Sequence, residues 1–432
     1  MHALDVYMID LSHNMLKGPP PEAPSSTVTY IVSNNSLMGA LPAWICNLSS
    51  AITLDLSFNN LTGVLPICLG NISKSLVVLN LKGNNFQGSI PELPMRGTQL
   101  TMIDLSDNQL HGKLPRSLAD CEKLKFINFA NNLIMDTFPS WLGSLPELRI
   151  LILRSNKFHG VIERPKSSHA SLKLRILDLS SNAFIGKLPM EFFQSWNAMK
   201  FEMRNFTYMN KDLYPPVFNP LTYYGHYDFS MIVIYKGHET IYQKILEVFT
   251  IIDLSINLFK GEIPNAIGDL RGLQGLNLSN NLLTGHIPSS LGNLTALESL
   301  DLSQNKLIGQ IPQKLIELGF LSFLNVSYNN LTGSVPKGKQ FDTFSDDSFE
   351  GNSRLCGEFI STKCRDSADK SGQPSTYQEE DLGSPIEHNW KIVLMGYGSG
   401  LVIGVVIENA FISWKHDWFE GNAKRRRRPS RR

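Results

Sequence analysis

The stretch Leu276–Pro288 reads LNLSNNLLTGHIP, and close copies begin at Leu300 (LDLSQNKLIGQIP) and Leu324 (LNVSYNNLTGSVP). Each copy follows the previous one after 24 residues and keeps an asparagine at the same place. That asparagine recurs at twelve positions: Asn14, Asn35, Asn59, Asn84, Asn108, Asn132, Asn156, Asn182, Asn257, Asn281, Asn305 and Asn329. A fixed period of this length indicates an array of stacked repeats.

The letters of the repeat, L-x-x-L-x-L-x-x-N-x-L-x-G-x-I-P, have physical reasons. Leucines two positions apart lie on one face of a short strand, which we expect to stack in parallel on the strand of the next repeat. The asparagine amide can pair with buried backbone groups of neighbouring turns. Glycine permits the turn, and Ile-Pro begins the return path. The twelve asparagines are therefore predicted to be structural rather than catalytic.

The pattern is identified as the leucine-rich repeat, and its L-x-G-x-[IL]-P half resembles the plant extracellular subtype. The predicted fold class is an α/β leucine-rich-repeat solenoid, right-handed, with a parallel sheet on its concave face and an insertion. Such a surface suits the binding of a protein or peptide better than small-molecule chemistry.

One interval between asparagines, from Asn182 to Asn257, is 75 residues long, about 51 more than a repeat needs. Residues 190–248 are therefore predicted to be an insertion, and fourteen aromatic residues lie between Glu191 and Val248. Insertions in solenoids often form the binding face, and aromatic side chains often anchor interfaces. The alternative is that these rings pack the insertion onto the solenoid.

An insertion followed by four repeats resembles the island domain of plant leucine-rich-repeat receptor-like proteins, particularly the kinase-less disease-resistance type. Tyr227, eight intervening residues and Lys236-Gly237 match a spacing found in those islands. The resemblance covers essentially the whole chain. It implies a receptor for a pathogen-derived or endogenous protein or peptide, which signals in defence through adaptor and co-receptor receptor-like kinases.

Candidate site residues follow from these predictions. The ligand-facing candidates are variable strand positions and island residues: Phe58, Asp107, Arg154, Tyr227 and Lys236. The resemblance places co-receptor contact in the last four repeats, represented by Ser303 and Tyr328. Ordinary solvated strand residues are the alternative for each. The sequence contains no H-E-x-x-H, no G-x-S-x-G and no protein-kinase signature, so we expect neither an enzyme nor a cofactor.

The five cysteines are predicted to be structural. Cys46 and Cys68 occupy similar points on adjacent repeats, and a disulfide there would contribute about 3 kcal/mol in the chain-entropy model. Two unpaired buried thiols are the alternative. Cys356 and Cys364 follow the last repeat in a segment that resembles the family's C-terminal cap, which implies a second disulfide. Cys121 is left as a buried free thiol, and without a Cys-x-x-Cys motif no zinc site is predicted.

Nine Asn-x-Ser/Thr sequences are candidate glycosylation sites, although the repeat pattern itself inflates their number. They are Asn34, Asn47, Asn60, Asn71, Asn205, Asn277, Asn293, Asn325 and Asn330. They agree with a secreted ectodomain.

Residues 390–414 are predicted to be a transmembrane helix. The run 392–407 carries no charge, and Trp390 and Trp414 flank it. Acidic residues precede the helix and basic residues follow it, so the positive-inside rule predicts a single-pass type I protein of the plasma membrane with extracellular repeats. The tail 415–432 is too short for a kinase, and its arginines are expected to contact anionic lipid rather than to bind nucleic acid.

The predicted span contains two notable features. Gly396, Gly400 and Gly404 form a stripe that lets another helix approach closely, which the resemblance assigns to an adaptor kinase. The alternative is that glycine is simply frequent in membrane helices. Glu408 departs from the apolar pattern and is either a partner contact or sequence drift.

The predicted organisation has seven parts. They are eight repeats without an N-terminal cap (1–189), the island (190–248), four repeats (249–336), the C-terminal cap (337–365), an acidic juxtamembrane segment (366–389), the transmembrane helix (390–414) and the basic tail (415–432). The net charge of +1 combines about −5 before residue 415 with about +6 after it, which disfavours a nucleic-acid-binding surface.

Three other functions stay open at this point. A developmental peptide receptor would use the same architecture. An inhibitor of a secreted enzyme, like the polygalacturonase inhibitors built on similar repeats, would need no membrane span. Because the chain begins inside a repeat and no signal peptide precedes it, a truncated copy that no longer signals is the third.

Overall fold

The computed structural model describes residues 6–69, 74–92, 97–163, 173–202, 206–209, 227–358 and 360–364. These residues belong to the first of two units, Met1–Arg365 and Asp366–Arg432. Everything that follows concerns the first unit.

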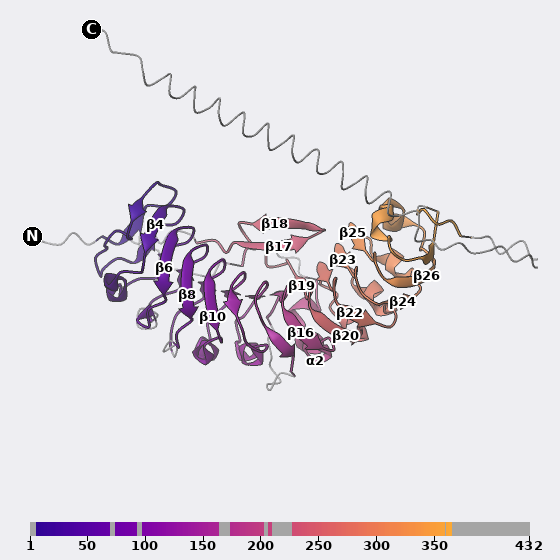
Figure 1. The fold of residues 1–432 in the computed structure, drawn as a ribbon, viewed down its shortest axis with the longest axis horizontal. Helices are drawn as coiled ribbons and strands as arrows, with labels where there is room; N and C mark the ends of the chain where they lie inside the picture. The colour runs from indigo at the N-terminus through magenta and orange to yellow at the C-terminus, as the bar shows by residue number, and fades with distance from the viewer. Residues whose placement is uncertain are drawn as a thin grey trace, which may run out of the picture. The chain divides into compact units, whose positions relative to one another are not determined.

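Twelve short strands form one parallel sheet, which we call the inner sheet (Figure 1). In order they are β1 (Met8–Asp10), β3 (Thr29–Ile31), β5 (Thr53–Asp55), β7 (Val78–Asn80), β9 (Met102–Asp104), β11 (Phe126–Asn128), β13 (Ile150–Ile152), β15 (Ile176–Asp178), β19 (Ile251–Asp253), β21 (Gly275–Asn277), β23 (Ser299–Asp301) and β25 (Phe323–Asn325). Each repeat supplies one strand, as the leucine spacing predicts. The central residue of each strand points into a continuous apolar core; Leu54 of β5, for example, pairs with Tyr30 of β3 and Leu79 of β7.

The repeat asparagines form a ladder between neighbouring turns. Asn59 is typical: its Nδ2 donates to Val32 O at 3.0 Å and to Leu56 O at 3.1 Å, and its Oδ1 accepts the Leu37 N–H at 3.0 Å. Asn352 continues the ladder inside the cap, where its Oδ1 accepts the Leu331 N–H at 3.0 Å. This asparagine was missed because it lies 23 residues after Asn329 in a segment without the repeat leucines.

The insertion leaves the ladder unbroken. β15 pairs directly with β19, and Asn257 Nδ2 donates to Leu179 O at 3.0 Å across 78 residues of sequence. Residues 190–199 still pack in the leucine core, and the insertion leaves the solenoid only after them, before it returns to the same edge. Part of it forms the antiparallel hairpin of β17 (Met231–Tyr235) and β18 (His238–Tyr242). Its Lys236-Gly237 turn has two positive φ angles, which suits a tight hairpin.

The other strands and helices carry the chain back along the solenoid. The return strands are β2 (Lys17–Gly18), β4 (Ser36–Gly39), β6 (Asn60–Val64), β8 (Asn85–Ser89), β10 (Gln109–Gly112), β12 (Leu133–Ile134), β14 (His159–Val161), β16 (Ala183–Gly186), β20 (Leu258–Glu262), β22 (Leu282–Thr284), β24 (Ile308–Gly309), β26 (Asn330–Ser334) and β27 (Arg354–Cys356). The helices are α2 (Met190–Ser195) and the 3-10 helices η1 (Ala43–Asn47), η2 (Arg116–Asp120), η3 (Ser140–Ser144), η4 (Asn197–Met199), η5 (Asn265–Asp269), η6 (Ser289–Asn293), η7 (Gln313–Glu317), η8 (Lys339–Thr343) and η9 (Asp346–Ser348).

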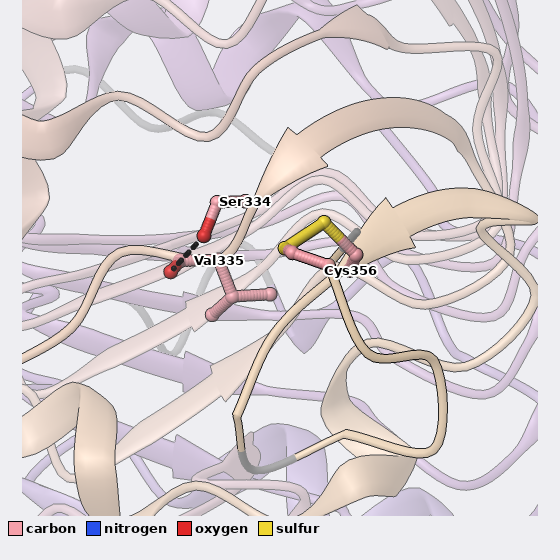
Figure 2. The surroundings of a disulfide bond; sticks show 4 residues. Ser334, Val335 and Cys356 are labelled. Carbon is pink, nitrogen blue, oxygen red and sulfur yellow. Dashed lines mark hydrogen bonds between the residues drawn. A yellow bond between two sulfur atoms is a disulfide. The ribbon is translucent and has the colours of Figure 1, made fainter. Parts of the chain in front are cut away.

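Two disulfides hold adjacent turns. Cys46 is joined to Cys68, with 5.4 Å between their Cα atoms, so the alternative of two free thiols there does not apply. Cys356 is joined to Cys364 at the end of the solenoid, with a Cα separation of 4.9 Å. Figure 2 shows this second bridge beside Ser334 and Val335; the Val335 N–H donates to Cys356 O at 2.8 Å. Cys121 is a buried free thiol, and burial raises its pKa to about 11.

Candidate functional site: the inner sheet under the island

The first and third residues of each inner-sheet strand point away from the leucine core. The third residues form a column in register: Asp10, Ile31, Asp55, Asn80, Asp104, Asn128, Ile152, Asp178, Asp253, Asn277, Asp301 and Asn325. In a bare repeat sheet this column would face solvent. Most of it is buried here, because the island lies over it.

A second apolar core joins the island to the middle of the sheet. The sheet contributes the first residues of six strands: Val78, Met102, Phe126, Ile150, Ile176 and Ile251. The island contributes five buried side chains, Met209, Phe229, Met231, Val233 and Ile245, and Phe249 follows directly after it. The rings of Phe126 and Phe229 lie 5.2 Å apart. The hairpin of β17 and β18 accordingly covers this part of the inner sheet (Figure 1).

The aromatic residues of the insertion divide into packing and exposed groups. Phe192, Phe193 and Trp196 belong to the leucine core. Tyr227, Tyr235 and Tyr242 pack against the second core. By contrast, the side chains of Phe201 and Phe206 are exposed. The packing alternative therefore accounts for most of the described rings.

Tyr227 is the deepest polar anchor of the island. Its hydroxyl donates to Asp55 Oδ2 at 2.8 Å and accepts from Asn80 Nδ2 at 2.6 Å. Burial and then the charge of Asp55 hold the pKa of Tyr227 well above its usual value. Burial also raises the pKa of Asp55, while hydrogen bonds from Ser57 and Tyr227 oppose the rise. The hydroxyl of Tyr227 therefore holds the island on the sheet, and contact of this residue with a ligand stays a prediction.

Glu247 is a second anchor, at the other end of the island. Its carboxylate accepts from Arg149 Nη1 at 2.5 Å and from Thr207 Oγ1 at 2.9 Å. Burial acts to raise the pKa of Glu247, but these two hydrogen bonds and the positive charge of Arg149 and Arg175 outweigh it and lower the pKa. An ionised Glu247 therefore ties the returning chain to the sheet.

Arg154 and Lys236 also hold the island. The Arg154 side chain is 8% exposed, and its Nη2 lies 3.6 Å from Glu239 Oε1 of β18. Its contact with a ligand stays a prediction, although little of the side chain is exposed. Lys236 lies in the hairpin turn, where its Nζ is 2.7 Å from Glu298 Oε2 and its N–H donates to Ser299 Oγ. Lys236 keeps a partly exposed side chain.

Phe58 and Asp107 remain open on the edge of the sheet. Phe58 is 47% exposed, and the Lys82 ammonium lies 5.4 Å from its ring centre. The same ammonium is 3.8 Å from Asp107 Oδ2, and Asn131 Nδ2 donates to Asp107 Oδ1 at 2.6 Å. Sequence reasoning missed Lys82, although it replaces the serine that most repeats carry there. These four residues form the Phe58 surface.

The two candidate co-receptor residues differ in exposure. Ser303 is buried, and its Oγ donates to Asp301 Oδ1 at 2.6 Å, so it serves the strand rather than a partner. Tyr328 is 52% exposed, in the same left-handed position of its repeat that Phe58 occupies. Of this pair, only Tyr328 is available to another protein.

The candidate glycosylation sites also differ in their surroundings. Asn47, Asn60 and Asn330 are exposed, while Asn34 and Asn293 are half-buried. Asn277 and Asn325 belong to the third-residue column. Asn277 Nδ2 donates to Asp253 Oδ2 at 3.1 Å, and Asn325 Oδ1 accepts from Ser327 Oγ at 2.7 Å. Asn71 and Asn205 lie outside the described residues.

Several predictions concern parts of the chain that the structure does not describe. Gly396, Gly400, Gly404 and Glu408 of the expected span 390–414 are among them, as is the tail. None of the helices in the described ranges combines the length and apolar character that a membrane crossing requires. Among the same residues, no three His, Cys, Asp or Glu side chains are grouped to hold a metal ion.

Comparison with known proteins supports the repeat assignment. Models of the leucine-rich repeat match residues 98–158 and 249–307, and also 50–72, 75–96 and 173–195. The chain is 48% identical to Receptor like protein 27 of Arabidopsis thaliana over 96% of its own length and 50% of that protein. Against the first four relatives it spans 42–51% of their length.

Solved structures give the same fold. The crystal structure of a TDR receptor is similar with a TM-score of 0.62 and 26% identity, over 82% of this chain and 52% of that one. The ectodomain of the Arabidopsis receptor kinase HAESA, in complex with an IDA peptide hormone, has a TM-score of 0.50 and 25% identity over 83% and 63%. The inner sheet, its asparagine ladder and the sequence match agree, and the chain belongs to the leucine-rich-repeat receptor-like proteins of plants.

Proposed function

We propose that the chain is the ligand-perceiving part of a kinase-less cell-surface receptor, which binds a protein or peptide and signals in plant defence through partner receptor kinases. The observation that carries the proposal is the 48% identity to a receptor-like protein over nearly the whole chain. The similarity to an ectodomain in complex with a peptide hormone supports a peptide or protein as the ligand class. The chain has no enzymatic activity of its own in this proposal.

The available surfaces narrow the ligand contacts. Because the island covers the middle of the inner sheet, a ligand reaches the Phe58 surface, the outer side of the island and the hairpin turn at Lys236. Tyr328 lies toward the last repeats, where we propose co-receptor contact. Phe58 and Asp107 are the ligand residues for which exposure and charge give the most support.

The membrane arrangement is part of the same proposal. Residues 390–414 would cross the plasma membrane once with the repeats outside, and Gly396, Gly400 and Gly404 would contact an adaptor kinase helix. Asn47, Asn60 and Asn330 are the described glycosylation sites with the most accessible side chains.

Co-purification tests this function. The full chain, tagged and expressed in leaves, is recovered from membranes before and after treatment with pathogen culture filtrate. The expected result is a receptor kinase that co-purifies, in larger amount after treatment. The double variant Phe58→Ala/Asp107→Ala should lose the increase, whereas Val64→Ala, an exposed position of the same repeat on β6, should keep it. Recovery of no receptor kinase under either condition would contradict the proposal.

The alternatives predict different results. A developmental receptor would respond to endogenous plant peptides and not to the culture filtrate. An enzyme inhibitor would be released from membranes by alkaline carbonate, whereas a single-pass receptor would stay with the lipid.

A further inference from the structure

Aspartate and asparagine alternate along much of the third-residue column. Asn128 Nδ2 donates to Asp104 Oδ2 at 3.1 Å, and Asn277 Nδ2 donates to Asp253 Oδ2 at 3.1 Å. An amide beside each carboxylate supplies a hydrogen bond without a second negative charge. The alternation therefore lets a row of carboxyl groups lie in a sheet whose strands are under 5 Å apart.

The alternation fails where the island leaves the solenoid. Asp178 of β15 and Asp253 of β19 are direct partners in the parallel register. They come from repeats that are adjacent in space but separated by the whole insertion in sequence. Two carboxyl groups thus lie side by side with no asparagine amide between them.

Both carboxyl groups are buried beneath the second core. Each residue is 2% exposed, and the first residues of their strands, Ile176 and Ile251, pack against the island. The same column is exposed at Asp10, in β1, and half-buried at Asp301, in β23. Asp55 and Asp104 of the same column are buried too, so the direct pairing of two buried carboxyl groups, and not burial alone, distinguishes Asp178 and Asp253.

The charges around the pair favour one negative charge rather than two. Arg154, two residues after the end of β13, faces Asp178 and also approaches Glu239 of β18. On β21, Asn277 donates to Asp253. Ser180 and Ser255 donate their N–H groups to the carboxylates of their own strands. Asp253 therefore has an amide on one side and a carboxylate on the other, while the cation serves Asp178.

We propose that Asp178 and Asp253 form a proton-binding site under the island, and that the bound proton keeps the island seated on β15 and β19. Two adjacent buried carboxyl groups cannot both ionise without a large electrostatic cost, so one keeps its proton. Lifting the island would hydrate both groups and let them ionise. The proposal deepens the proposed function by naming a regulator of the island, which lies next to the proposed ligand surface.

The direction of the pH effect follows from linkage. Burial and then the charge of Asp178 raise the pKa of Asp253 to about 7, from an ordinary value of 3.8. The seated state thus holds a proton that the open state releases. The free-energy advantage of the seated state is complete near pH 4 and is lost as pH rises through 7. For one proton, the equilibrium constant for opening rises by at most about tenfold per pH unit.

Hydrogen exchange tests the coupling. The amides of residues 229–249 are followed in the full chain between pH 5 and pH 8, with rates corrected for the intrinsic pH dependence of exchange. We expect protection of these amides to fall by up to about tenfold per pH unit between pH 5 and 7. Asp253→Asn should flatten the slope, whereas Asp10→Asn, an exposed member of the same column, should leave it unchanged.

Infrared spectroscopy tests the proton itself and does not depend on how far the island opens. At pH 6 the wild type should show the C=O stretch of a buried carboxylic acid, which Asp253→Asn should remove. Absence of that band would overturn the proton site, and a band with pH-independent protection would overturn its coupling to the island. Neither measurement uses a ligand or a kinase, so failure here is separate from failure of the receptor function.

Discussion

The middle and the C-terminal end of the inner sheet are built from the same repeat but differ in what covers them. From β7 to β19 the first strand residues include Val78, Phe126 and Ile251, which are buried under the island. From β21 to β25 they are Gly275, Ser299 and Phe323, which lie outside the second core. The leucines and asparagines are the same in both regions. The variable strand positions, not the consensus ones, therefore record where the island docks.

Gly275 lies at the boundary between the two regions. A Cβ atom there would come within 3.2 Å of both Ile251 Cγ1 and Tyr235 Cε2. The glycine thus lets the tyrosine of the hairpin lie close against the first strand beyond the second core. The first residue of the strand changes from Ile251 on β19 to Gly275 on β21, so the second core ends between these two strands.

Removal of a large island side chain should have the largest effect. Phe229→Ala is expected to cost about 3–5 kcal/mol of the free energy that seats the island, because it leaves a cavity over Phe126. Hydrogen exchange of residues 229–249 should rise steeply while β23 and β25 keep their protection. The control Phe341→Ala, a buried phenylalanine of the C-terminal cap, should leave island exchange unchanged. Equal effects of both variants would contradict the division of the sheet.

The hydroxyl of Tyr227 should have the next largest effect. Tyr227→Phe removes one hydrogen bond to Asp55 and one from Asn80 and leaves both partners buried. We expect a loss of about 1–3 kcal/mol in the free energy of unfolding, measured by thermal or urea denaturation. Tyr7→Phe, at an exposed ring, is the control and should unfold like the wild type. A loss of stability no larger than that of the control would show that the hydrogen bonds of Tyr227 do not stabilise the fold.

The effect of relieving backbone strain on stability should be smaller and should not depend on the island. Ile256, after the covered β19, has φ of 51°, a left-handed conformation that β-branched residues rarely adopt; Asn280, after the uncovered β21, has the same φ of 51°. Ile256→Asn should therefore stabilise the chain by about 1 kcal/mol, and Asn280→Ile should destabilise it by a similar amount. Thermal denaturation measures both. Unequal magnitudes would mean that the cover, and not the φ angle, sets the cost.

The smallest expected effect is an acid limb in the pH profile of island protection, which is a loss of hydrogen-exchange protection at low pH. The pKa of Glu247 is lowered, so its ion pair stabilises the seated island above pH 4.5 and is lost as pH falls below that value. Together with Asp253, whose contribution falls as pH rises above about 4, this predicts greatest protection of residues 229–249 at about pH 4 to 4.5. Glu247→Gln should remove the acid limb and leave the neutral limb. A profile unchanged by Glu247→Gln would exclude this anchor as its source.

The periodic part of the fold could be predicted from the sequence. Each strand, ladder asparagine and return turn repeats a local pattern, so the position of one unit gives the next. The prediction stopped at Asn352, whose turn lacks the leucines that mark a repeat although its amide makes the same bonds. Hydrogen bonding of the ladder survives there because the cap residues Phe349 and Leu355 supply the apolar contact instead.

The docking of the island could not be predicted by the same means. Tyr227 meets Asp55 across 172 residues and Asn80 across 147, and no periodic signal connects them. Arg154 was taken as ligand-facing because strand alternation gives the direction of a side chain but not what lies over it, and Tyr227 was taken so because it lies in the island. The row of apolar first residues was the available signal. It departs from Thr29 and Thr53 on the strands before it and from Gly275 and Ser299 on the strands after it.

Methionine oxidation tests the central claim, which is that the island covers the middle of the inner sheet. Met102 lies on β9 under the island and Met231 within it, whereas Met38 on β4 and Met135 just after β12 are exposed. Hydrogen peroxide converts accessible thioethers to sulfoxides, which mass spectrometry locates. The account predicts that Met38 and Met135 oxidise while Met102 and Met231 stay reduced, and that Phe229→Ala makes Met102 reactive. Oxidation of Met102 in the wild type as fast as Met38 would contradict it.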